Sequence, residues 1–291
     1  MKKYSVLVLA VVLIPSFALS ATSNFSLKVG GGLGYSIIGE INDILRDYPV
    51  FIRTYRRNVS DDLAPVHFGP NFVLEAVYSL NPSFSLGLAV GYGSAQNQGS
   101  IHLEYGYESQ PIIVDETYTP KVRFIPFTLS GYYTMALNQK WSVILGAGLG
   151  YNWATFIFEK DTRSEAAWGV STMDSVFRAG RGALGVQASA AIEMNISPLL
   201  SVFVSGSFRL ALASGFIGEL EFNWNDYGVT GSITHENRTF WVYTFNHSGT
   251  GYTEYAFRDT TPSGAQFYSN VHKGKINIGG AILGIGARIR L

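Results

Sequence analysis

The side chains that could carry out catalysis are few, and their spacing matches no familiar catalytic or metal-binding arrangement. The chain has five histidines: His67, His102, His235, His247 and His272. His247 and Ser248 pair a base with a nucleophile, but "NHSGTG" is typical of a turn, and neighbours on a strand point to opposite faces. Asp226 and His235 share a long loop, where residues often meet by chance. We therefore predict no catalytic residue, no metal and no cofactor, with a lipid-modifying enzyme as an alternative.

The beginning of the chain has the composition of a secretory signal peptide. Two lysines precede an apolar run, and Ala18 and Ser20 are the small residues of a cleavage site. We predict a signal peptide over residues 1–20 and a single domain over residues 21–291. The chain has no cysteine, which excludes disulfides and thiolate metal sites.

The composition indicates a chain that lies in a membrane as strands. Charged residues make up 14% of the chain, well below the roughly 25% of soluble domains, while glycines number 32 and aromatic residues reach 14%. The 21 basic and 21 acidic residues balance, so no nucleic-acid partner is predicted. No run after the predicted signal peptide reaches the ~18 apolar residues of a membrane helix. These features together are typical of a transmembrane β-barrel.

Glycines at alternate positions in "WSVILGAGLGYNW" distinguish a strand from a helix. On a helix, Gly146, Gly148 and Gly150 would spread around the axis, and each would cost about 1 kcal/mol relative to alanine. On a strand they share one face, while the other face is continuously apolar with aromatic residues at both ends. The segment from Trp141 to Tyr151 then rises about 25 Å at a ~40° tilt, which is the spacing of two aromatic girdles in a membrane barrel.

Seven further segments alternate in the same way, which predicts eight strands in all. They cover residues 25–35, 68–80, 84–93, 125–135, 184–194, 202–212 and 281–291. Tight turns are predicted at Asn81-Pro82, Asn138-Gln139 and Ser197-Pro198, and long loops at residues 38–65, 97–119, 159–180 and 214–274. Three short and four long connections suit eight antiparallel strands with both termini on one side. A ten-stranded barrel, with "NHSGTG" as an extra turn, is the alternative.

This pattern resembles the small outer-membrane β-barrel proteins, the family that includes the membrane domain of OmpA and the OmpX and OmpW barrels. The resemblance extends from Asn24 to Leu291 and implies an all-β, transmembrane antiparallel up-and-down barrel with long extracellular loops. It implies contact with outer-membrane lipid and lipopolysaccharide, insertion by the barrel-assembly machinery, and a monomer. The chain closes "GIGARIRL" on Leu291, where the family usually has an aromatic residue.

Six charged side chains take the inward parity of the predicted strands: Lys28, Glu75, Glu193, Arg209, Arg288 and Arg290. An eight-stranded barrel encloses only enough space for side chains, so these charges should pair and fill the lumen. An unpaired buried charge would cost several kcal/mol. We predict a largely plugged lumen. The alternative is a narrow pore for small or apolar solutes, left open by the inward glycines.

The first long loop is predicted to hold a short amphipathic helix, because four of its residues have helical spacing: Ile38, Ile41, Leu45 and Tyr48. Three arginines follow, Arg53, Arg56 and Arg57, and guanidinium groups of this kind pair well with lipopolysaccharide phosphates. The alternative is a solvated basic stretch balanced by Asp61 and Asp62.

The last long loop is rich in aromatic residues. Trp224, Trp241 and Tyr243 are candidates for a binding surface, and the alternative is that the loop packs against itself. Together these patterns predict a structural or adhesive barrel whose loops bind a surface. They do not name an extracellular ligand.

Overall fold

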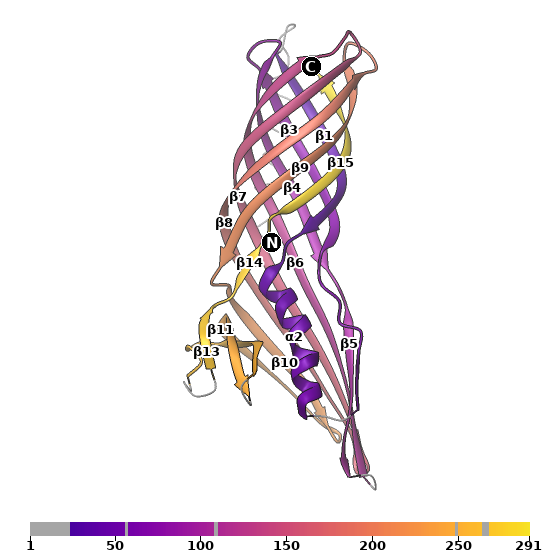
Figure 1. Ribbon diagram of the computed structural model, residues 1–291, viewed down its shortest axis with the longest axis vertical. Coiled ribbons are helices and arrows are strands. Elements are labelled where there is room, and N and C mark those ends of the chain that lie inside the picture. Colours follow the sequence, from indigo (N-terminus) through magenta and orange to yellow (C-terminus); the bar gives the residue numbers. More distant parts are fainter. Residues whose placement is uncertain (1–23, 56–57, 108–109, 248–249, 264–267) are drawn as a thin grey trace.

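The computed structural model describes residues 24–55, 58–107, 110–247, 250–263 and 268–291. The predicted signal peptide, Arg56, Arg57 and Ser248 lie outside the described residues. Within them the chain is almost entirely β-sheet, with one α-helix (Figure 1). Every strand pair among these residues is antiparallel.

Eight strands form a closed ring, which we call the barrel. They are β1 (Phe25–Ser36), β3 (Phe68–Ser79), β4 (Phe84–Gln96), β6 (Gln110–Ala136), β7 (Trp141–Ala166), β8 (Gly169–Asn195), β9 (Leu200–Ser214) and β15 (Gly280–Arg290). Each strand pairs with the next, and β1 pairs with β15 to close the ring. The predicted eight strands are therefore confirmed, and the alternative of ten strands in the ring is wrong.

Three tight turns lie at one end of the barrel, at the predicted positions. Asn81 Oδ1 accepts hydrogen bonds from two backbone amides at 2.9 Å, and Asn138 Oδ1 accepts from two at 2.8 and 3.0 Å. Ser197 Oγ accepts from Leu200 N at 3.1 Å. The last residue lies at the same end, where Leu291 N donates to Phe25 O at 3.1 Å (Figure 1). We call this the turn end of the barrel.

The outer face of the barrel is apolar and the inner face is largely polar. Leu149 and Leu184 are 69% and 81% exposed on the outside, whereas Ser130 and Asn152 are each 2% exposed on the inside. Aromatic rings pair at both ends of this outer face, Phe25 with Tyr78 and Phe84 with Tyr133 at the turn end, and Tyr35 with Phe68 at the other. We call this continuous outer face the apolar belt.

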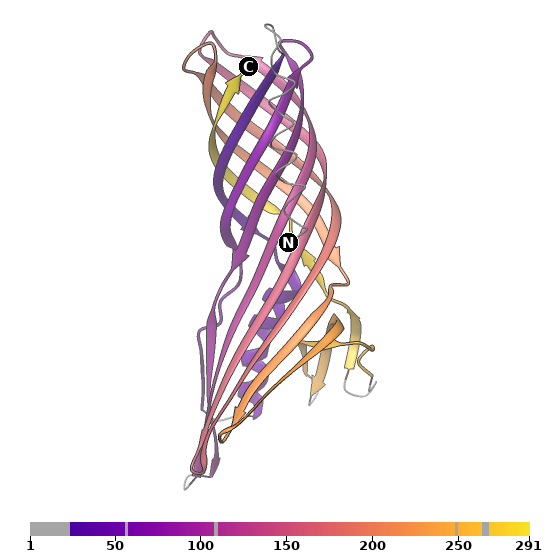
Figure 2. The same cartoon turned by 180° about the vertical axis from the view of Figure 1, so that it is seen from behind.

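Three barrel strands continue far beyond the belt. β6, β7 and β8 have 27, 26 and 27 residues, against the ~9–11 that cross a bilayer. Further strands flank or extend them: β2 (Asn58–Asp61), β5 (Gly99–Tyr107), β10 (Ile217–Asp226), β11 (Val229–His247), β12 (Thr250–Arg258), β13 (Tyr268–Lys273) and β14 (Lys275–Asn277). We call this part the extension; Figures 1 and 2 show it curving around the helix. The predicted loops at residues 97–119 and 159–180 are thus largely strand hairpins.

The apolar face changes sides where the strands leave the belt. On β7, Trp153 is 47% exposed on the outside, while the next inward residues, Ala154 and Phe156, are each 0% exposed. The parity of the strand stays constant, so the apolar side chains move from the outer face to the inner face. The change follows from the hydrophobic effect if the belt contacts lipid and the extension contacts water.

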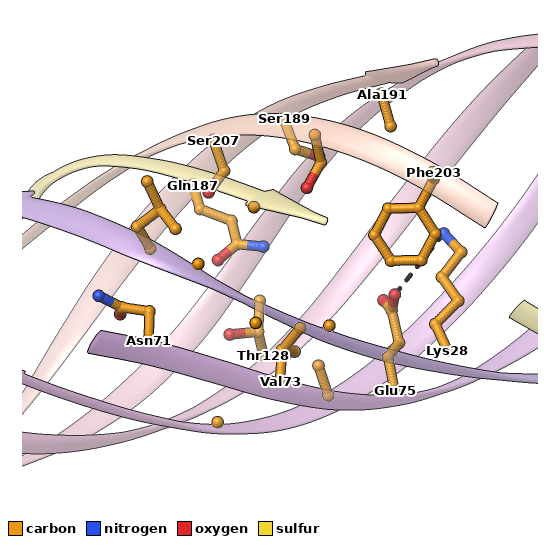
Figure 3. A pocket seen from close by; sticks show the side chains of 18 of the residues that line it. Lys28, Asn71, Val73, Glu75, Thr128, Gln187, Ser189, Ala191, Phe203 and Ser207 are labelled. Carbon is orange, nitrogen blue, oxygen red and sulfur yellow. Dashed lines mark ion pairs between the residues drawn. The ribbon is translucent and has the colours of Figure 1, made fainter. Parts of the chain in front are cut away.

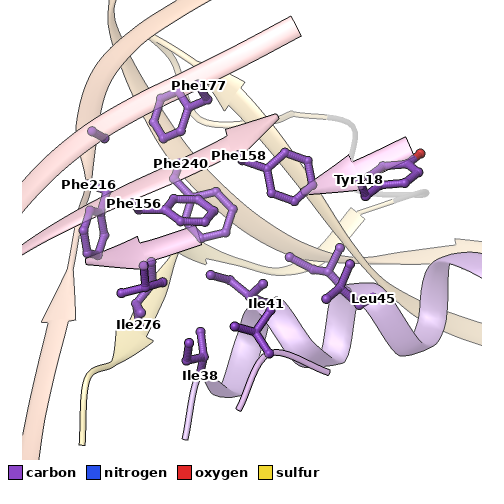
Figure 4. Packing of buried hydrophobic residues seen from close by; sticks show 14 of the residues in the cluster. Ile38, Ile41, Leu45, Tyr118, Phe156, Phe158, Phe177, Phe216, Phe240 and Ile276 are labelled. Carbon is purple, nitrogen blue, oxygen red and sulfur yellow. The ribbon is translucent and has the colours of Figure 1, made fainter. Parts of the chain in front are cut away.

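The extension has a hydrophobic core of its own, packed between the concave sheet and the helix (Figure 4). Phe177, Phe216 and Ile276 are fully buried. The rings of Phe177 and Phe257 stack with centroids 4.1 Å apart. Each fully buried side chain of this size contributes roughly 1.5–3 kcal/mol. The extension is therefore a packed body and not a set of loose loops.

Helix α2 (Gly39–Tyr55) confirms the helix predicted in the first long segment. Ile41 and Leu45 are 1% and 4% exposed, because the helical spacing puts both on the face that meets the sheet. Glu40 Oε2 accepts a hydrogen bond from Lys275 N at 2.6 Å, and Asp47 Oδ2 accepts one from Thr253 N at 3.2 Å. The helix is thereby fixed to two distant parts of the chain. Among the described residues, no helix has the length and apolar character needed to cross a membrane.

Candidate functional site in the barrel lumen

Charged side chains fill the turn end of the lumen in two groups. In the first group, Lys28 Nζ lies 3.7 Å from Glu75 Oε2, and the two residues are register partners on β1 and β3. Tyr132 OH donates to Glu75 Oε1 at 2.5 Å, and Lys28 Nζ lies 4.3 Å from the centre of the Tyr132 ring. The Lys28 and Glu75 side chains are almost fully buried. In this group the positive charge of Lys28 and the negative charge of Glu75 offset each other inside the barrel.

The second group is built around the carboxylate of Glu193, whose side chain is 1% exposed. Arg290 Nη2 donates to Glu193 Oε1 at 2.8 Å, and Ser201 Oγ donates to the same oxygen at 2.6 Å. Arg288 Nη1 lies 3.7 Å from Glu193 Oε2, while its Nε donates to Ser26 Oγ at 2.8 Å. Two cations thus share one buried carboxylate.

Inward glycines make room for this plug. A Cβ at Gly87 would overlap the Glu75 carboxylate, and a Cβ at Gly146 would lie only 2.5 Å from Tyr132 Cε1. The Tyr132 side chain therefore occupies space that two strands leave by lacking side chains. At this level of the barrel, the space left by the alternating glycines is occupied by the side chains of the plug, so the glycines do not widen the lumen.

A cavity of about 140 Å³ borders the plug (Figure 3). Its wall is largely apolar, with glycines and side chains such as Val73 and Phe203, but it also includes the polar side chains of Asn71, Thr128, Gln187, Ser189 and Ser207. At about 30 Å³ for each water in the liquid, the volume suits four or five waters. The lumen thus combines a charged plug with a small cavity that has several polar side chains in its wall.

Arg209 stands apart from the other five predicted lumen charges. It lines the cavity, and its Cζ lies 5.1 Å from the centre of the Phe124 ring. Its register partners are Gln187 on β8 and Gly280 on β15. No carboxylate among the described residues forms an ion pair with it. The structure therefore places five of the six charges in the plug and leaves Arg209 outside it.

The candidate surface residues differ in their exposure. Arg53 forms an ion pair with Asp61, as the alternative of a balanced basic stretch predicted. Trp224 is 37% exposed, whereas Trp241 is 8% exposed and donates from Nε1 to a backbone carbonyl at 3.3 Å. Tyr243 is partly buried, and its hydroxyl donates to a backbone carbonyl at 3.3 Å. Of the three aromatic candidates, Trp224 alone opens to the surface, and the other two pack within the extension.

An exposed aromatic pair, whose pairing was not predicted from the sequence, lies at the far tips of the extension. Trp168 and Tyr227 occupy the turns between β7 and β8 and between β10 and β11. Trp168 Nε1 donates to Tyr227 OH at 2.6 Å, and the residues are 59% and 49% exposed. Tyr227 has a φ of 50°, a conformation that non-glycine residues seldom adopt. The available signal was that each residue precedes a glycine between two alternating segments.

The described histidines do not form a Ser–His–Asp chain of hydrogen bonds. His102 Nδ1 lies 2.6 Å from Asp115 Oδ1, and Ser60 is the register partner of His102. However, the Ser60 hydroxyl makes no hydrogen bond to the ring, and all three residues lie on the exposed outer face of the extension. Asp226 and His235 are not brought together, because Asp226 pairs with Val229 and His235 with Leu220. No group of three or more metal-binding side chains occurs in the described ranges.

A buried polar cluster lies between helix α2 and the sheet of the extension. Glu116 accepts hydrogen bonds from Tyr118 at 2.5 Å and Tyr48 at 3.1 Å, and its carboxylate lies 2.7 Å from Lys160 Nζ. Burial raises the pKa of Tyr48 above its usual value. Burial also raises the pKa of Glu254 to about 7, although Lys160 opposes the shift, and Glu254 Oε1 has no hydrogen-bond partner among the described residues. The interior of the extension thus contains a carboxyl group that titrates near neutral pH.

Comparison with known proteins gives distant structural likeness only. No protein-family model and no curated protein matches the chain. The chain is similar to a major outer membrane protein from Thermus thermophilus, with a TM-score of 0.37 and 14% identity over 92% of this chain and 98% of that one. It is also similar to the outer membrane protease OmpT from Escherichia coli, with a TM-score of 0.27 and 9% identity over 92% and 96%. Likeness at these TM-scores assigns neither a fold nor a function to the chain.

Proposed function

We propose that the chain is an outer-membrane β-barrel protein with a plugged lumen, whose extension stands outside the cell in a structural or surface-binding role. The apolar belt is the observation that carries this proposal. In water, a continuous apolar surface around the whole barrel would cause aggregation. In a bilayer the same surface is required, and the closed ring leaves no backbone edge unpaired in lipid.

The dimensions and ends of the belt support a membrane location. Trp141 and Tyr151 lie on β7 near opposite ends of the belt, and they are 40% and 45% exposed. The strand between them suits the ~25 Å apolar band of a membrane barrel. The tight turns then face the periplasm, because short turns lie on that side, and the extension faces outward.

The plug is the reason to expect that the barrel conducts ions poorly. Lys28, Glu75 and Tyr132 obstruct one side of the turn end, and the group around Glu193 obstructs the other. The cavity supports the second candidate, a narrow pore for small solutes, because side chains do not fill this part of the lumen.

Planar-bilayer recording separates these two candidates. We expect no stable large conductance from the unmodified protein, and at most small, brief currents. The double variant Glu75→Ala with Arg288→Ala should raise the conductance by removing the plug, whereas Arg178→Ala on the outside of the extension should not. A steady porin-sized conductance from the unmodified protein would overturn the plug.

The exposed tips support the surface-binding role. Trp168 and Tyr227 present large, partly apolar rings far from the belt, and residues of this kind are enriched in binding interfaces. A non-glycine residue in the conformation of Tyr227 costs of order 1 kcal/mol and commonly marks a functional position. The pair is therefore the best candidate contact point of the extension.

Labelling of intact cells tests the outward position of these tips. The chain has no cysteine, so Trp168→Cys and Asn138→Cys each introduce a single thiol. A membrane-impermeant maleimide should label the first variant in intact cells and the second only after the outer membrane is broken. The reverse pattern would show that the extension faces the periplasm.

A further inference from the structure

Arg209 is a partly buried cation to which no described residue supplies a counter-charge. Of the six lumen charges, four are cations and two are carboxylates, which leaves an excess of two positive charges. Glu75 pairs with Lys28, and Glu193 serves both Arg288 and Arg290. Arg209 therefore carries a charge that the plug does not offset.

The register of the barrel keeps Arg209 far from both carboxylates. Its partner on β8 is Gln187, and Glu193 lies six residues further along that strand, a separation of about 20 Å. Glu75 lies at the level of Lys28 and Arg288, whereas Arg209 lies at the level of Gly280. Neither carboxylate can reach the guanidinium by a change of side-chain rotamer.

The contacts of Arg209 leave most of its donors unused. The Phe124 ring lies 5.1 Å from Cζ and offers its face, but it provides no strong hydrogen-bond acceptor for the five N–H groups of the guanidinium. The remaining side of Arg209 opens to the cavity of about 140 Å³.

The cavity walls near Arg209 offer hydrogen-bond donors. Ser207 precedes Arg209 by one inward position on β9, and its register partner Ser189 adds a second hydroxyl. Gln187 and Asn71 contribute side-chain amides to the same cavity. The carboxylates that line the cavity are Glu75 and Glu193, and both are held in the plug. The part of the cavity beside Arg209 thus combines a cation with neutral donors.

We propose that this part of the lumen binds a small inorganic anion, held by Arg209 and by hydroxyl and amide donors of the cavity wall. A bound anion offsets the charge of a guanidinium that is partly removed from water and has no ion-pair partner among the described residues. The volume suits one halide-sized ion with a few waters. The site lies between the plug and the extension and does not depend on conduction through the plug.

Bromide tests the site directly, because its anomalous scattering distinguishes it from water. Crystals of the full chain soaked in sodium bromide should show an anomalous peak in the cavity within hydrogen-bond distance of the Arg209 guanidinium. The peak should vanish in Arg209→Gln and persist in Arg209→Lys, which keeps the charge. Arg181→Gln, which removes an exposed arginine, should leave the peak unchanged.

Thermal unfolding gives a second measurement in solution. Replacing gluconate by bromide at constant ionic strength should raise the unfolding midpoint of the unmodified protein and of Arg209→Lys, but not that of Arg209→Gln, because a ligand that binds only the folded state stabilises it. The proposal is overturned if the cavity holds only water at saturating bromide, or if the bromide peak or the midpoint shift is the same in Arg209→Gln.

Discussion

Arg290 Nη2 donates to Glu193 Oε1 at 2.8 Å across β9, the strand that separates β15 from β8. The same oxygen accepts a hydrogen bond from Ser201 on β9 at 2.6 Å. One buried carboxylate therefore joins three neighbouring strands at the turn end of the barrel. No local sequence feature requires this contact, because Glu193 and Arg290 meet only after the ring has closed.

The first prediction concerns Glu193. Glu193→Gln leaves Arg288 and Arg290 without a counter-charge inside the barrel, so we expect the free energy of unfolding to fall by about 3–5 kcal/mol. Urea unfolding in lipid vesicles, followed by tryptophan fluorescence, measures the change. Glu221→Gln is the matched control, because its partner Arg178 is exposed and the loss should stay below about 1 kcal/mol. Equal losses in the two variants would contradict the account of the plug.

The second prediction is energetic coupling between Lys28 and Glu75. Glu75→Gln alone should destabilise the barrel, and adding Lys28→Gln should recover part of the loss, because the two side chains are 3.7 Å apart and nearly buried. A double-mutant cycle should give a coupling free energy of roughly 0.5–3 kcal/mol. If the two single effects simply add, the residues do not act as one group.

The third prediction is a pH dependence that originates from Glu254. Its pKa is about 7 in the folded protein, chiefly because of burial, and about 4.3 in an unfolded chain. The folded state therefore binds the proton more tightly, so the stability from this group is fully present below about pH 4 and is lost as pH rises through about 7. The loss is at most about 4 kcal/mol, at about 1.4 kcal/mol for each pH unit that separates the two pKa values, and it is smaller if other groups relax around the charge.

Proteolysis of the extension in detergent at a series of pH values measures this effect. Resistance should fall between about pH 4 and pH 7 in the unmodified protein. Glu254→Gln should remove most of that fall and leave the extension more resistant at the higher pH, whereas Glu221→Gln should not. An unchanged pH profile in Glu254→Gln would assign the dependence to other groups.

The fourth prediction concerns the helix in the extension. Ile41→Ala removes a fully buried side chain between α2 and the sheet, so it should destabilise the extension by about 2–5 kcal/mol. The ring of the barrel does not depend on the helix. In gel electrophoresis, the unboiled variant should therefore still migrate differently from the boiled variant, as expected of a folded barrel. Val50→Ala is the control on the exposed side of the same helix. Loss of the folded barrel in Ile41→Ala would show that the two parts do not fold separately.

The strands of the barrel could be predicted from sequence because an apolar outer face and a largely polar inner face impose a strict period of two. The extension could not be placed in the same way. On β7 the apolar parity changes sides after Trp153, so Phe156 and Phe158 point inward to a core that consists largely of residues far away in sequence. The alternation with apolar residues on the outer face therefore stops near Trp153. For this reason residues 159–180 were predicted as a long loop.

The candidate site was predictable in its composition but not in its pairing. Parity alone placed Arg209 and Glu193 on the inner face. The distance between them depends on the register of β8 with β9, which one sequence does not determine. The Trp168–Tyr227 contact depends in the same way on two turns that are brought together by the pairing of β8 with β10.

Accessibility along β6 tests the central claim most directly, that the apolar belt contacts lipid. Because the chain has no cysteine, spin labels can be attached at Phe127→Cys and Leu129→Cys in the belt, and at Asn138→Cys in a turn as a water-exposed control. In lipid vesicles, the two belt positions should collide with oxygen, which concentrates in lipid, far more than with a water-soluble nickel complex, and Asn138→Cys should show the opposite preference. Nickel-dominated collisions at both belt positions would contradict a membrane-spanning barrel.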